Sequence, residues 1–267
     1  MVNGESEDPF VQYYAEESLT AKAVERSEGV LGAVMRARSA AGVRTEALEV
    51  ADVGCNAGTQ SLVWARRGHK VYGLDINADL IAIAIQRARD AGIVIDFRVG
   101  TATELPWRTG SVDVCLLPEL LEHVPDWETC LNEACRVLKP GGALHVSTTN
   151  RLCPVQQEFD LPLYSWYPAA LKRYCERLSV TTRPQWVSHA KYPAVNWFTP
   201  YELRDWFAQR GFTFSDRFDL MDISAKGQLA RTIVALIRAI PILRWAGHLA
   251  TPGTFIVGIK TSAHGRP

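Results

Sequence analysis

Two carboxylates and an imidazole stand close together in the middle of this 267-residue chain, at Glu119, Glu122 and His123. They directly follow a strand-like apolar run, residues 112–117. If residues 119–123 are helical, Glu122 and His123 lie three and four positions after Glu119, so all three side chains share one face. Oxygen ligands favour magnesium or manganese, and the imidazole also suits zinc. The alternative is a solvated polar cluster that caps a helix start, where acidic residues are common.

A second group of residues predicts a ligand pocket. Residues 49–58 run from an apolar segment through Asp52 into a turn that contains Gly54 and Gly58, and a second apolar run ends at Asp75. Doubly wound sheets bind ligands at the carboxyl ends of adjacent parallel strands. There the glycines let the backbone approach a ligand, and Asp75 is placed to accept hydrogen bonds from ribose hydroxyls. The pattern therefore predicts a nucleotide-type pocket.

The glycine spacing distinguishes two kinds of nucleotide pocket. A dinucleotide fingerprint, Gly-x-Gly-x-x-Gly, would need glycines at Asn56 and Thr59, so this turn is poorly suited to a pyrophosphate. The segment instead resembles motif I of class I S-adenosylmethionine (SAM)-dependent methyltransferases, Asp/Glu-x-Gly-x-Gly-x-Gly, with Asn56 in place of the middle glycine. Asparagine tolerates a left-handed backbone better than other non-glycine residues, so we expect the loop to keep its conformation.

The elements that must position these residues alternate along the chain. Strands are predicted near residues 48–53, 70–75, 93–99, 112–117 and 142–148, and helices near 58–67, 78–91 and 126–137. This alternation indicates an α/β fold whose parallel, doubly wound sheet is covered on both faces. Residues 212–220 and 254–261 are predicted as the last two strands, which form an antiparallel pair in the family that motif I resembles. We therefore expect a mostly parallel, seven-stranded, Rossmann-like sheet with an antiparallel last strand.

One domain over residues 1–267 is the economical interpretation of this length and of a 47% hydrophobic content. The resemblance to motif I implies that it is a SAM-dependent methyltransferase domain. Its expected parts are N-terminal helices over 11–42, a cofactor-binding core over 48–150, an aromatic lid insertion over 151–197 and an amphipathic helical insertion over 228–250. Thr199-Pro200-Tyr201-Glu202 predicts a capping box that opens a further helix.

The composition of the chain limits which binding partners and which cellular compartment we expect. Lysine plus arginine equals aspartate plus glutamate at 29 each, so the chain lacks the basic field that duplex nucleic acid requires. The six cysteines form no C-x-x-C pair, which favours a reduced, cytoplasmic protein. Residues 1–9 resemble no signal peptide, and no uninterrupted 18-residue apolar span occurs. We expect a cytoplasmic location, with a peripheral place at the inner membrane face also compatible.

Glu-x-x-Glu-His at residues 119–123 also resembles the ubiquinone-biosynthesis O-methyltransferases and the small-RNA 2′-O-methyltransferases. In those families the Glu, Glu and His bind a divalent cation that chelates adjacent substrate hydroxyls. The resemblance to the ubiquinone branch covers residues 48–152 and resumes at 198–203. A further histidine precedes that last motif in the families, and His189 is the nearest here. The implied metal ligands for Mg²⁺, Mn²⁺ or Zn²⁺ are Glu119, Glu122, His123 and His189.

The same motif also occurs in methyltransferases with no demonstrated metal. In that case His123, with Glu122 beside it, is the candidate catalytic residue, because an unperturbed imidazole titrates near neutral pH and can act as general base.

The resemblance also implies which residues surround SAM. They are Asp52, Gly54, Asn56, Gly58, Asp75, Ile76, Thr101, Ala102 and Leu117. Many relatives carry an acid where this chain has Thr101, within Gly-Asp-Ala-x-x-Leu-Pro. A hydroxyl can still serve the adenine edge, with backbone groups near Ala102 completing the contacts. An ordinary turn residue is equally compatible with Thr101.

Two insertions bear on the methyl acceptor. Residues 152–197 carry eight aromatic side chains, which suit a hydrophobic or planar acceptor but also suit simple anchoring of the insertion. Residues 229–250 place Arg231 and Arg238 on one helical face, and Arg244 and His248 on another beyond Pro241. That is typical of a basic amphipathic segment at a bilayer interface. A helix pair packed on the sheet, or a homodimer contact, explains the same pattern.

We therefore expect a SAM-dependent methyltransferase that methylates a hydroxyl of a small aromatic, quinol or lipid-linked acceptor, with a divalent metal as one form of assistance. The alternatives are a C- or N-methyltransferase of a small molecule, or a non-catalytic SAM-binding accessory protein.

Overall fold

The computed structural model describes residues 9–156, 158–187 and 194–261. Its internal contacts divide the chain into two compact units. The first unit comprises Met1–Pro118, Asp126–His145 and Ile259–Pro267, and the second comprises Glu119–Pro125 and Val146–Gly258.

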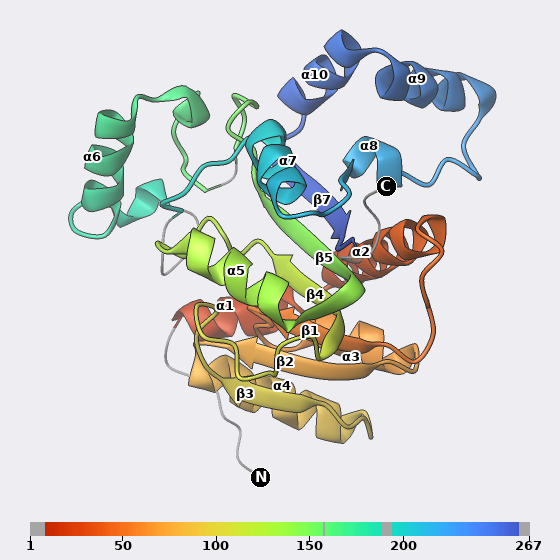
Figure 1. Cartoon of the computed structure of the whole chain (residues 1–267). Coiled ribbons are helices and arrows are strands. Elements are labelled where there is room, and N and C mark those ends of the chain that lie inside the picture. Colours follow the sequence, from red (N-terminus) through yellow and green to blue (C-terminus); the bar gives the residue numbers. More distant parts are fainter. Residues whose placement is uncertain (1–8, 157, 188–193, 262–267) are drawn as a thin grey trace. The chain divides into compact units, whose positions relative to one another are not determined.

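Seven strands form one sheet in the order β3-β2-β1-β4-β5-β7-β6 (Figure 1). The strands are β1 (Glu49–Val53), β2 (Lys70–Asp75), β3 (Asp96–Val99), β4 (Val112–Pro118), β5 (Leu138–Thr149), β6 (Ser215–Asp216) and β7 (Gly253–Ile259). β1 pairs in parallel with both β2 and β4, whereas β6 pairs antiparallel with β7. The prediction of a mostly parallel, seven-stranded, doubly wound sheet with an antiparallel last strand is confirmed.

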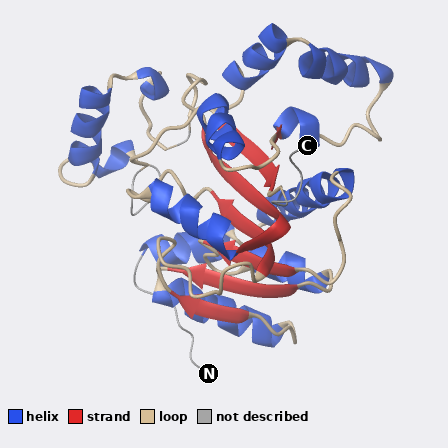
Figure 2. Ribbon diagram, viewed as in Figure 1, coloured by secondary structure: helices blue, strands red, loops and turns tan. Residues whose placement is uncertain are grey.

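Helices cover both faces of the strands in the first unit (Figure 2). They are α1 (Pro9–Glu17), α2 (Ala21–Ala40), α3 (Thr59–Arg66), α4 (Ala78–Asp90) and α5 (Trp127–Val137). Local sequence sets their starts, because Thr20, Asn77 and Asp126 cap α2, α4 and α5 with side-chain oxygens that accept backbone N–H groups. α3 packs on β1 and β2, while α4 packs on β2 and β3. These are the strands whose carboxyl ends carry Asp52 and Asp75.

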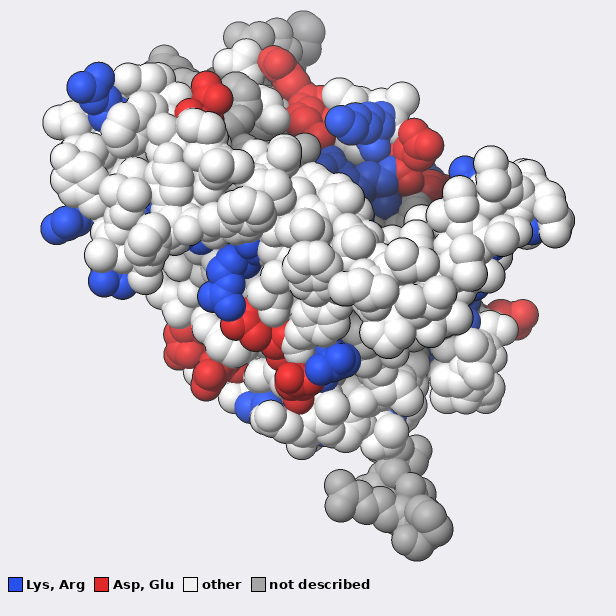
Figure 3. Space-filling view, turned by 90° about the horizontal axis from the view of Figure 1, so that it is seen from above, with Lys and Arg blue, Asp and Glu red and all other residues white. Residues whose placement is uncertain are grey.

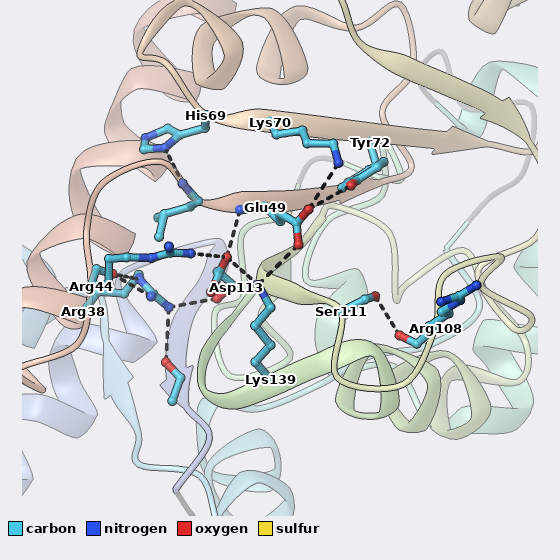
Figure 4. Close-up of polar contacts among 12 residues, drawn as sticks. Arg38, Arg44, Glu49, His69, Lys70, Tyr72, Arg108, Ser111, Asp113 and Lys139 are labelled. Atoms are coloured by element: carbon cyan, nitrogen blue, oxygen red, sulfur yellow. Dashed lines mark hydrogen bonds and ion pairs between the residues drawn. The ribbon is translucent and has the colours of Figure 1, made fainter.

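A buried arginine ties the end of α2 to the strand starts (Figure 4). Arg38 is 2% exposed. Its guanidinium donates to the backbone oxygens of Arg44, Asp113 and Gly141, at 2.6–3.2 Å. These three carbonyls belong to three separate segments, so one side chain holds the turn after α2 against β4 and β5.

Asp113 lies beside this arginine, and its carboxylate accepts hydrogen bonds from two cationic side chains and one backbone N–H. Its Oδ2 atom accepts from Lys139 Nζ at 2.9 Å, Arg44 Nη2 at 3.0 Å and the backbone N–H of Glu49 at 2.9 Å (Figure 4). Burial by itself would raise the pKa of Asp113, but the hydrogen bonds from Glu49 and Lys139 and the charges of Lys139 and Arg44 hold that pKa below its ordinary value. Asp113 is therefore ionised wherever the fold is intact near neutral pH.

Asp113→Ala should lower the free energy of unfolding by about 2 kcal/mol, because it removes a buried acceptor of charged hydrogen bonds. The folded-state pKa is the lower one, so this contribution is present above about pH 4 and is lost as the pH falls further. Urea denaturation at pH 7 and pH 3 measures both effects. Asp90→Ala, which removes an exposed carboxylate at the end of α4, is the control and should change the free energy little. Equal stability of Asp113→Ala and the wild type at pH 7 would contradict the assigned role.

The second unit holds both insertions. Its elements are η1 (Tyr164–Trp166), α6 (Ala169–Ser179), η2 (Pro184–Trp186), α7 (Pro200–Gln209), α8 (Arg217–Leu220), α9 (Gln228–Ala239) and α10 (Pro241–Leu249), with β6 and most of β7. Thr199 and Glu202 form the predicted capping box at the start of α7, with Pro200 at its first helical position. All six cysteines of the chain are free. No helix in the described part of the chain is long and apolar enough to cross a membrane.

The predicted length of one strand in this unit is wrong. Residues 212–220 were expected to form a single strand, but only Ser215–Asp216 pairs with β7. The carboxylate of Asp216 accepts the backbone N–H groups of Phe218 and Asp219, and Asp219 returns a carboxylate to the N–H of Asp216. This capping box turns the chain into α8 and ends the strand.

Candidate functional site

The glycine-rich loop between β1 and α3 has the backbone that its sequence indicates. Gly54, Asn56 and Gly58 all have left-handed conformations, with φ of 77°, 48° and 83°. The N–H groups of Gly54 and Cys55 both donate to the carbonyl of Leu74 at the end of β2, at 2.7 and 3.0 Å. A Cβ on Gly58 would lie 2.9 Å from Cβ of Ala84. Glycine is therefore required at position 58, and Asn56 adopts the conformation expected of the missing glycine.

Asp75 closes the other side of this loop. Its Oδ2 accepts the backbone N–H of Asn56 and its Oδ1 accepts that of Asn77, each at 2.9 Å. Burial raises the pKa of Asp75, although the backbone N–H groups of Asn77, Asn56 and Ile76 oppose that shift. Each oxygen keeps a further lone pair, so the carboxylate can also accept the two hydroxyls of a ribose.

Asp52 is the second acid of this region and is fully buried. Its Oδ2 accepts from the Ser61 hydroxyl at 2.6 Å, and its Oδ1 has no hydrogen-bond partner among the described residues. Burial is the main cause that raises the pKa of Asp52 to about 7; the Ser61 hydrogen bond opposes this rise and the charge of Asp75 adds to it. No lysine or arginine within the described ranges pairs with Asp52 or Asp75. Two such acids suit a ligand that brings its own positive charge, and SAM carries an ammonium and a sulfonium.

The other residues predicted to surround SAM differ in how exposed they are. Ile76 is a large apolar side chain that is 71% exposed directly after Asp75, as a flat base would require. Thr101 is exposed, and its hydroxyl lies 2.8 Å from that of Thr103. Its oxygen also accepts the N–H of Thr103, which is ordinary turn geometry. Ala102 is half-buried and Leu117 is fully buried within β4.

Residues 119–123, which the shared-face argument took as helical, form a turn instead. Glu119 has a left-handed backbone with φ of 46°, and the N–H of His123 donates to the carbonyl of Leu120 at 3.0 Å. Helix α5 begins only at Trp127, after Pro125 and the cap residue Asp126. Glu119 is exposed and, because the segment is a turn, it does not share a helical face with Glu122 and His123.

Glu122 is the most buried acid of this turn, with no exposed surface. Its Oε2 accepts from the Thr148 hydroxyl at 2.9 Å, whereas Oε1 has no hydrogen-bond partner within the described ranges. Burial raises the pKa of Glu122 well above its ordinary value, and the charges of Glu119 and Glu158 add to the rise, while the Thr148 hydrogen bond opposes it. A buried carboxylate oxygen in this state needs either a proton or a cation.

The structure brings a residue to this turn that the sequence analysis missed. Glu122, His123 and Glu158 each offer one ligand atom, and these atoms lie within 4.8 Å of one another. Burial raises the pKa of Glu158 to about 7, with a further contribution from the charge of Glu119. Glu119 itself is not in this group, and His189 lies outside the described residues. No motif singled out Glu158, because it lies 35 residues after His123, within the insertion.

The insertion is anchored so that Glu158 is held in place. The side-chain oxygen of Gln156 accepts the backbone N–H groups of Glu158 and Phe159, at 2.6 and 2.8 Å. The Phe159 ring stacks on Tyr164, with centroids 4.1 Å apart. On the other side, the N–H groups of Val195 and Asn196 donate to the carbonyl of Glu122, at 2.8 and 3.1 Å.

Most of the insertion's aromatic residues serve as an anchor. Phe159 and Tyr164 form a buried cluster with Cys175, against which Tyr167, Trp186 and Trp197 pack. The ammonium of Lys172 lies over the Trp197 ring, 4.2 Å from its centroid. Two large aromatic side chains, Trp166 and Tyr174, remain about half exposed, at 54% and 51%. The anchoring interpretation therefore holds for most of these rings.

Comparisons with known proteins bear on the family and the fold of the chain. Residues 51–146 match the family described as "Methyltransferase domain", so the chain contains a methyltransferase domain with the fold of the SAM-dependent class. The ubiquinone biosynthesis O-methyltransferase of Xanthomonas oryzae pv. oryzae is 39% identical over 103 residues, which cover 38% of this chain and 43% of the relative. That of Xanthomonas axonopodis pv. citri is 32% identical over 168 residues, covering 62% and 63%.

Both alignments span less than two thirds of the relatives' own length. A SAM-dependent methyltransferase from Methanosarcina mazei has a similar fold, with a TM-score of 0.52 at 22% identity, over 84% of this chain and 97% of the other.

Proposed function

We propose that this chain, whose core is a methyltransferase domain, transfers a methyl group from SAM to a hydroxyl of a small aromatic, quinol or lipid-linked acceptor. We propose further that a divalent cation held by Glu122, His123 and Glu158 assists the transfer. One observation carries the metal part of the proposal: the fully buried Glu122, whose Oε1 has no hydrogen-bond partner among the described residues, offers a ligand atom within 4.8 Å of those of His123 and Glu158.

SAM supplies an electrophilic methyl group, so the protein's part is to bind, align and exclude water. Asp75 accepts the ribose hydroxyls, and at Gly54 and Gly58 the loop lets the backbone approach the ligand without a Cβ in the way. Asp52 offers a buried carboxylate oxygen to the cationic end of the cofactor. Ile76 provides an exposed apolar side chain for the base.

Glu122, His123 and Glu158 are the residues that would hold the cation, together offering oxygen and nitrogen ligands. When bound, such an ion lowers the pKa of an acceptor hydroxyl and orients it. Thr148 keeps Glu122 in position through its hydroxyl, and Gln156 fixes the backbone that carries Glu158.

The acceptor class is proposed from the relatives and from the insertion. The relatives in both Xanthomonas species are O-methyltransferases by name. Trp166 and Tyr174 offer exposed aromatic surface for a planar acceptor. Free cysteines throughout the chain support action in the cytoplasm.

One other mechanism and two other functions are distinct alternatives. If no metal binds, His123 would act as general base beside Glu122. Methyl transfer to a carbon or nitrogen acceptor would need neither the metal nor the base. A non-catalytic SAM-binding protein would have little use for a cluster of two carboxylates and an imidazole around the buried Glu122, which is why we place it last.

Methyl transfer to a panel of catechols, hydroquinones and amines tests the proposal. We expect labelled methyl groups from SAM to appear on oxygen, the reaction to stop in EDTA, and activity to return with Mg²⁺, Mn²⁺ or Zn²⁺. Calorimetry should show that SAM still binds in EDTA, because Asp52 and Asp75 lie in a separate group of residues. Full turnover in EDTA would remove the metal from the proposal, and a methylated carbon or nitrogen would replace O-methylation. No SAM binding at all would end the methyltransferase interpretation.

A further inference from the structure

The guanidinium of Arg217 has no partner in the described part of the chain. Arg217 is the first residue of α8 and is half-buried. Its Nε is buried without a hydrogen-bond partner, and within the described ranges no ion pair reaches the guanidinium. The two Nη atoms also lack a partner there but are not fully buried, so a ligand can reach them. A largely buried cation that stays unpaired is costly, so this position calls for an anion.

The adjacent acid does not pair with Arg217, because other groups already occupy it. Oδ2 of Asp216 contacts Arg244 Nε at 2.8 Å and His248 Nε2 at 2.9 Å. Oδ1 of Asp216 caps the start of α8 by accepting two backbone N–H groups. Both oxygens of this carboxylate are therefore engaged, which leaves the guanidinium of Arg217 without its nearest acid in sequence.

Two other arginines near α8 have backbone partners. Arg231 donates to carbonyls within residues 223–224. Arg238 donates to carbonyls within residues 218–221, at 2.8–3.2 Å. These two side chains tie α9 to the chain around α8, which corrects the expectation from helical spacing that they form a basic stripe on an amphipathic face. Arg217 differs from both, because no described residue bonds to its guanidinium.

Strand directions place Arg217 at the same edge of the sheet as Glu119. β7 runs antiparallel to β6. The start of β7 lies beside the end of β5, since the N–H of Asn150 donates to the carbonyl of Pro252 at 2.9 Å, so β7 is antiparallel to β5 as well. β5 and β6 therefore end at one edge, where Arg217 directly follows β6. Glu119 lies at this edge too, because its N–H donates to the carbonyl of Ser147 near the end of β5, at 2.9 Å.

The charge of Glu119 connects Arg217 with the candidate ligands of the neighbouring turn. Burial lowers the pKa of Arg217, and the charges of Asp216 and Glu119 oppose that shift. Burial raises the pKa values of Glu122 and Glu158, and the charge of Glu119 adds to both rises. Glu119 therefore lies close enough to both groups for its charge to act on each. An acceptor whose hydroxyl lies beside Glu122 shares this group of charges with an unpaired guanidinium.

A single group of charges, not a broad field, would select an anionic ligand here. The formal net charge of the chain is zero. On the face drawn in Figure 3, basic side chains of the described residues stand beside acidic ones. That surface would not attract anions in general, so their recognition falls to a particular guanidinium.

We propose that Arg217 binds an oxyanion of the methyl acceptor, a carboxylate or a phosphate, and so positions the acceptor and sets its specificity. The planar fork of a guanidinium matches both groups, because two N–H donors can meet two oxygens. An amine or an uncharged substituent makes no such pair, so the acceptor class narrows to hydroxylated compounds that carry an acidic group. The inference rests on the proposed function, since it concerns the acceptor of that reaction.

Calorimetry on the full chain with S-adenosylhomocysteine tests this without methyl transfer. The probes are protocatechuate, its phosphonate analogue and, as the uncharged match, its amide. Wild-type protein should bind at least one of the two acids more tightly than the amide. Arg217→Gln should reduce that preference about 10-fold or more, because it removes hydrogen bonds to a charged group. Arg217→Lys keeps the charge without the planar fork and should retain part of the preference.

A matched control separates Arg217 from a general loss of positive charge. Arg89→Gln removes an exposed arginine from the last turn of α4 and should keep the wild-type preference. A purely structural role of Arg217 would weaken the binding of all three probes alike and leave their ratios unchanged, which would overturn the proposal. Wild-type protein that binds neither acid more tightly than the amide would also overturn it, as would an equal loss of preference in Arg89→Gln.

The two acidic probes identify the oxyanion. Tighter binding of the phosphonate favours a phosphate, tighter binding of protocatechuate favours a carboxylate, and both results support the site. Methyl transfer from SAM to oxygen of the amide, with no preference for either acid, keeps O-methylation and overturns this inference alone. An acid preference that depends on Arg217, together with methylation on carbon or nitrogen, keeps the oxyanion site and replaces O-methylation.

Discussion

Glu122→Ala should lower methyl transfer by roughly 100-fold or more, because even the residues that only support metal ligands typically cost 10–100-fold when they are lost. The buried position of Glu122 and its unpartnered Oε1 motivate this expectation. Steady-state assays with saturating SAM and added Mn²⁺ measure the loss. Titration with Mn²⁺ by calorimetry should show a parallel loss of metal binding.

The combination of variants is more informative than any single one. Glu122, His123 and Glu158 would act through one ion, so the triple alanine variant should lose little more activity than the worst single variant. Glu119→Ala should cost less than Glu122→Ala, since the Glu119 carboxylate is exposed and outside the group of close ligand atoms. Glu128→Ala removes an exposed carboxylate from the first turn of α5 and serves as the control.

Other outcomes have distinct meanings. Additive losses across the three positions would argue against a shared ion. A severe loss in His123→Ala alone, with Glu158→Ala fully active and no effect of EDTA, would identify a metal-free enzyme that uses His123 as its base.

Asp75→Ala should weaken SAM binding by about 10- to 150-fold, since hydrogen bonds to a charged acceptor contribute about 1.5–3 kcal/mol. The same substitution leaves the N–H groups of Asn56 and Asn77 without their carboxylate, which should loosen the loop. Isothermal calorimetry with SAM and with S-adenosylhomocysteine measures the effect. Both ligands should lose affinity, because both carry the ribose.

Asp90→Ala provides the comparison, because Asp90 is an exposed acid at the far end of the helix that follows Asp75. Its affinity for SAM should equal that of the wild type. Mn²⁺ binding should survive in Asp75→Ala, which keeps Glu122, His123 and Glu158. Unchanged SAM affinity in Asp75→Ala would remove this acid from the cofactor site.

Local sequence determined the glycine-rich loop between β1 and α3. The order of apolar run, acid and glycines predicted a strand, a tight turn and a helix, and it placed Asp52 and Asp75 at the ends of β1 and β2. The loop at Gly54, Asn56 and Gly58 depends on which residues tolerate a left-handed backbone, a property of single residues. The alternation of strands and helices likewise predicted the parallel sheet, since residue periodicity records which faces are buried.

Tertiary structure determined which residues gather around Glu122. The shared face of Glu119, Glu122 and His123 required a helix at residues 119–123, but the chain leaves β4 through a left-handed Glu119 and starts α5 only after Pro125. Glu158 reaches Glu122 because the insertion folds back through its aromatic anchor, a contact between segments far apart in the chain.

Helices α9 and α10 show the same difference between what local sequence predicts and what packing determines. Amphipathic spacing predicted helices α9 and α10 and their apolar side, yet the direction of each arginine depended on where carbonyls and Asp216 lie in space. Helical spacing indicates which side chains share a face. It does not indicate which groups a guanidinium contacts once distant segments pack against each other. Local backbone preference was therefore readable from the sequence, whereas the polar contacts between remote segments were decided by the packed fold.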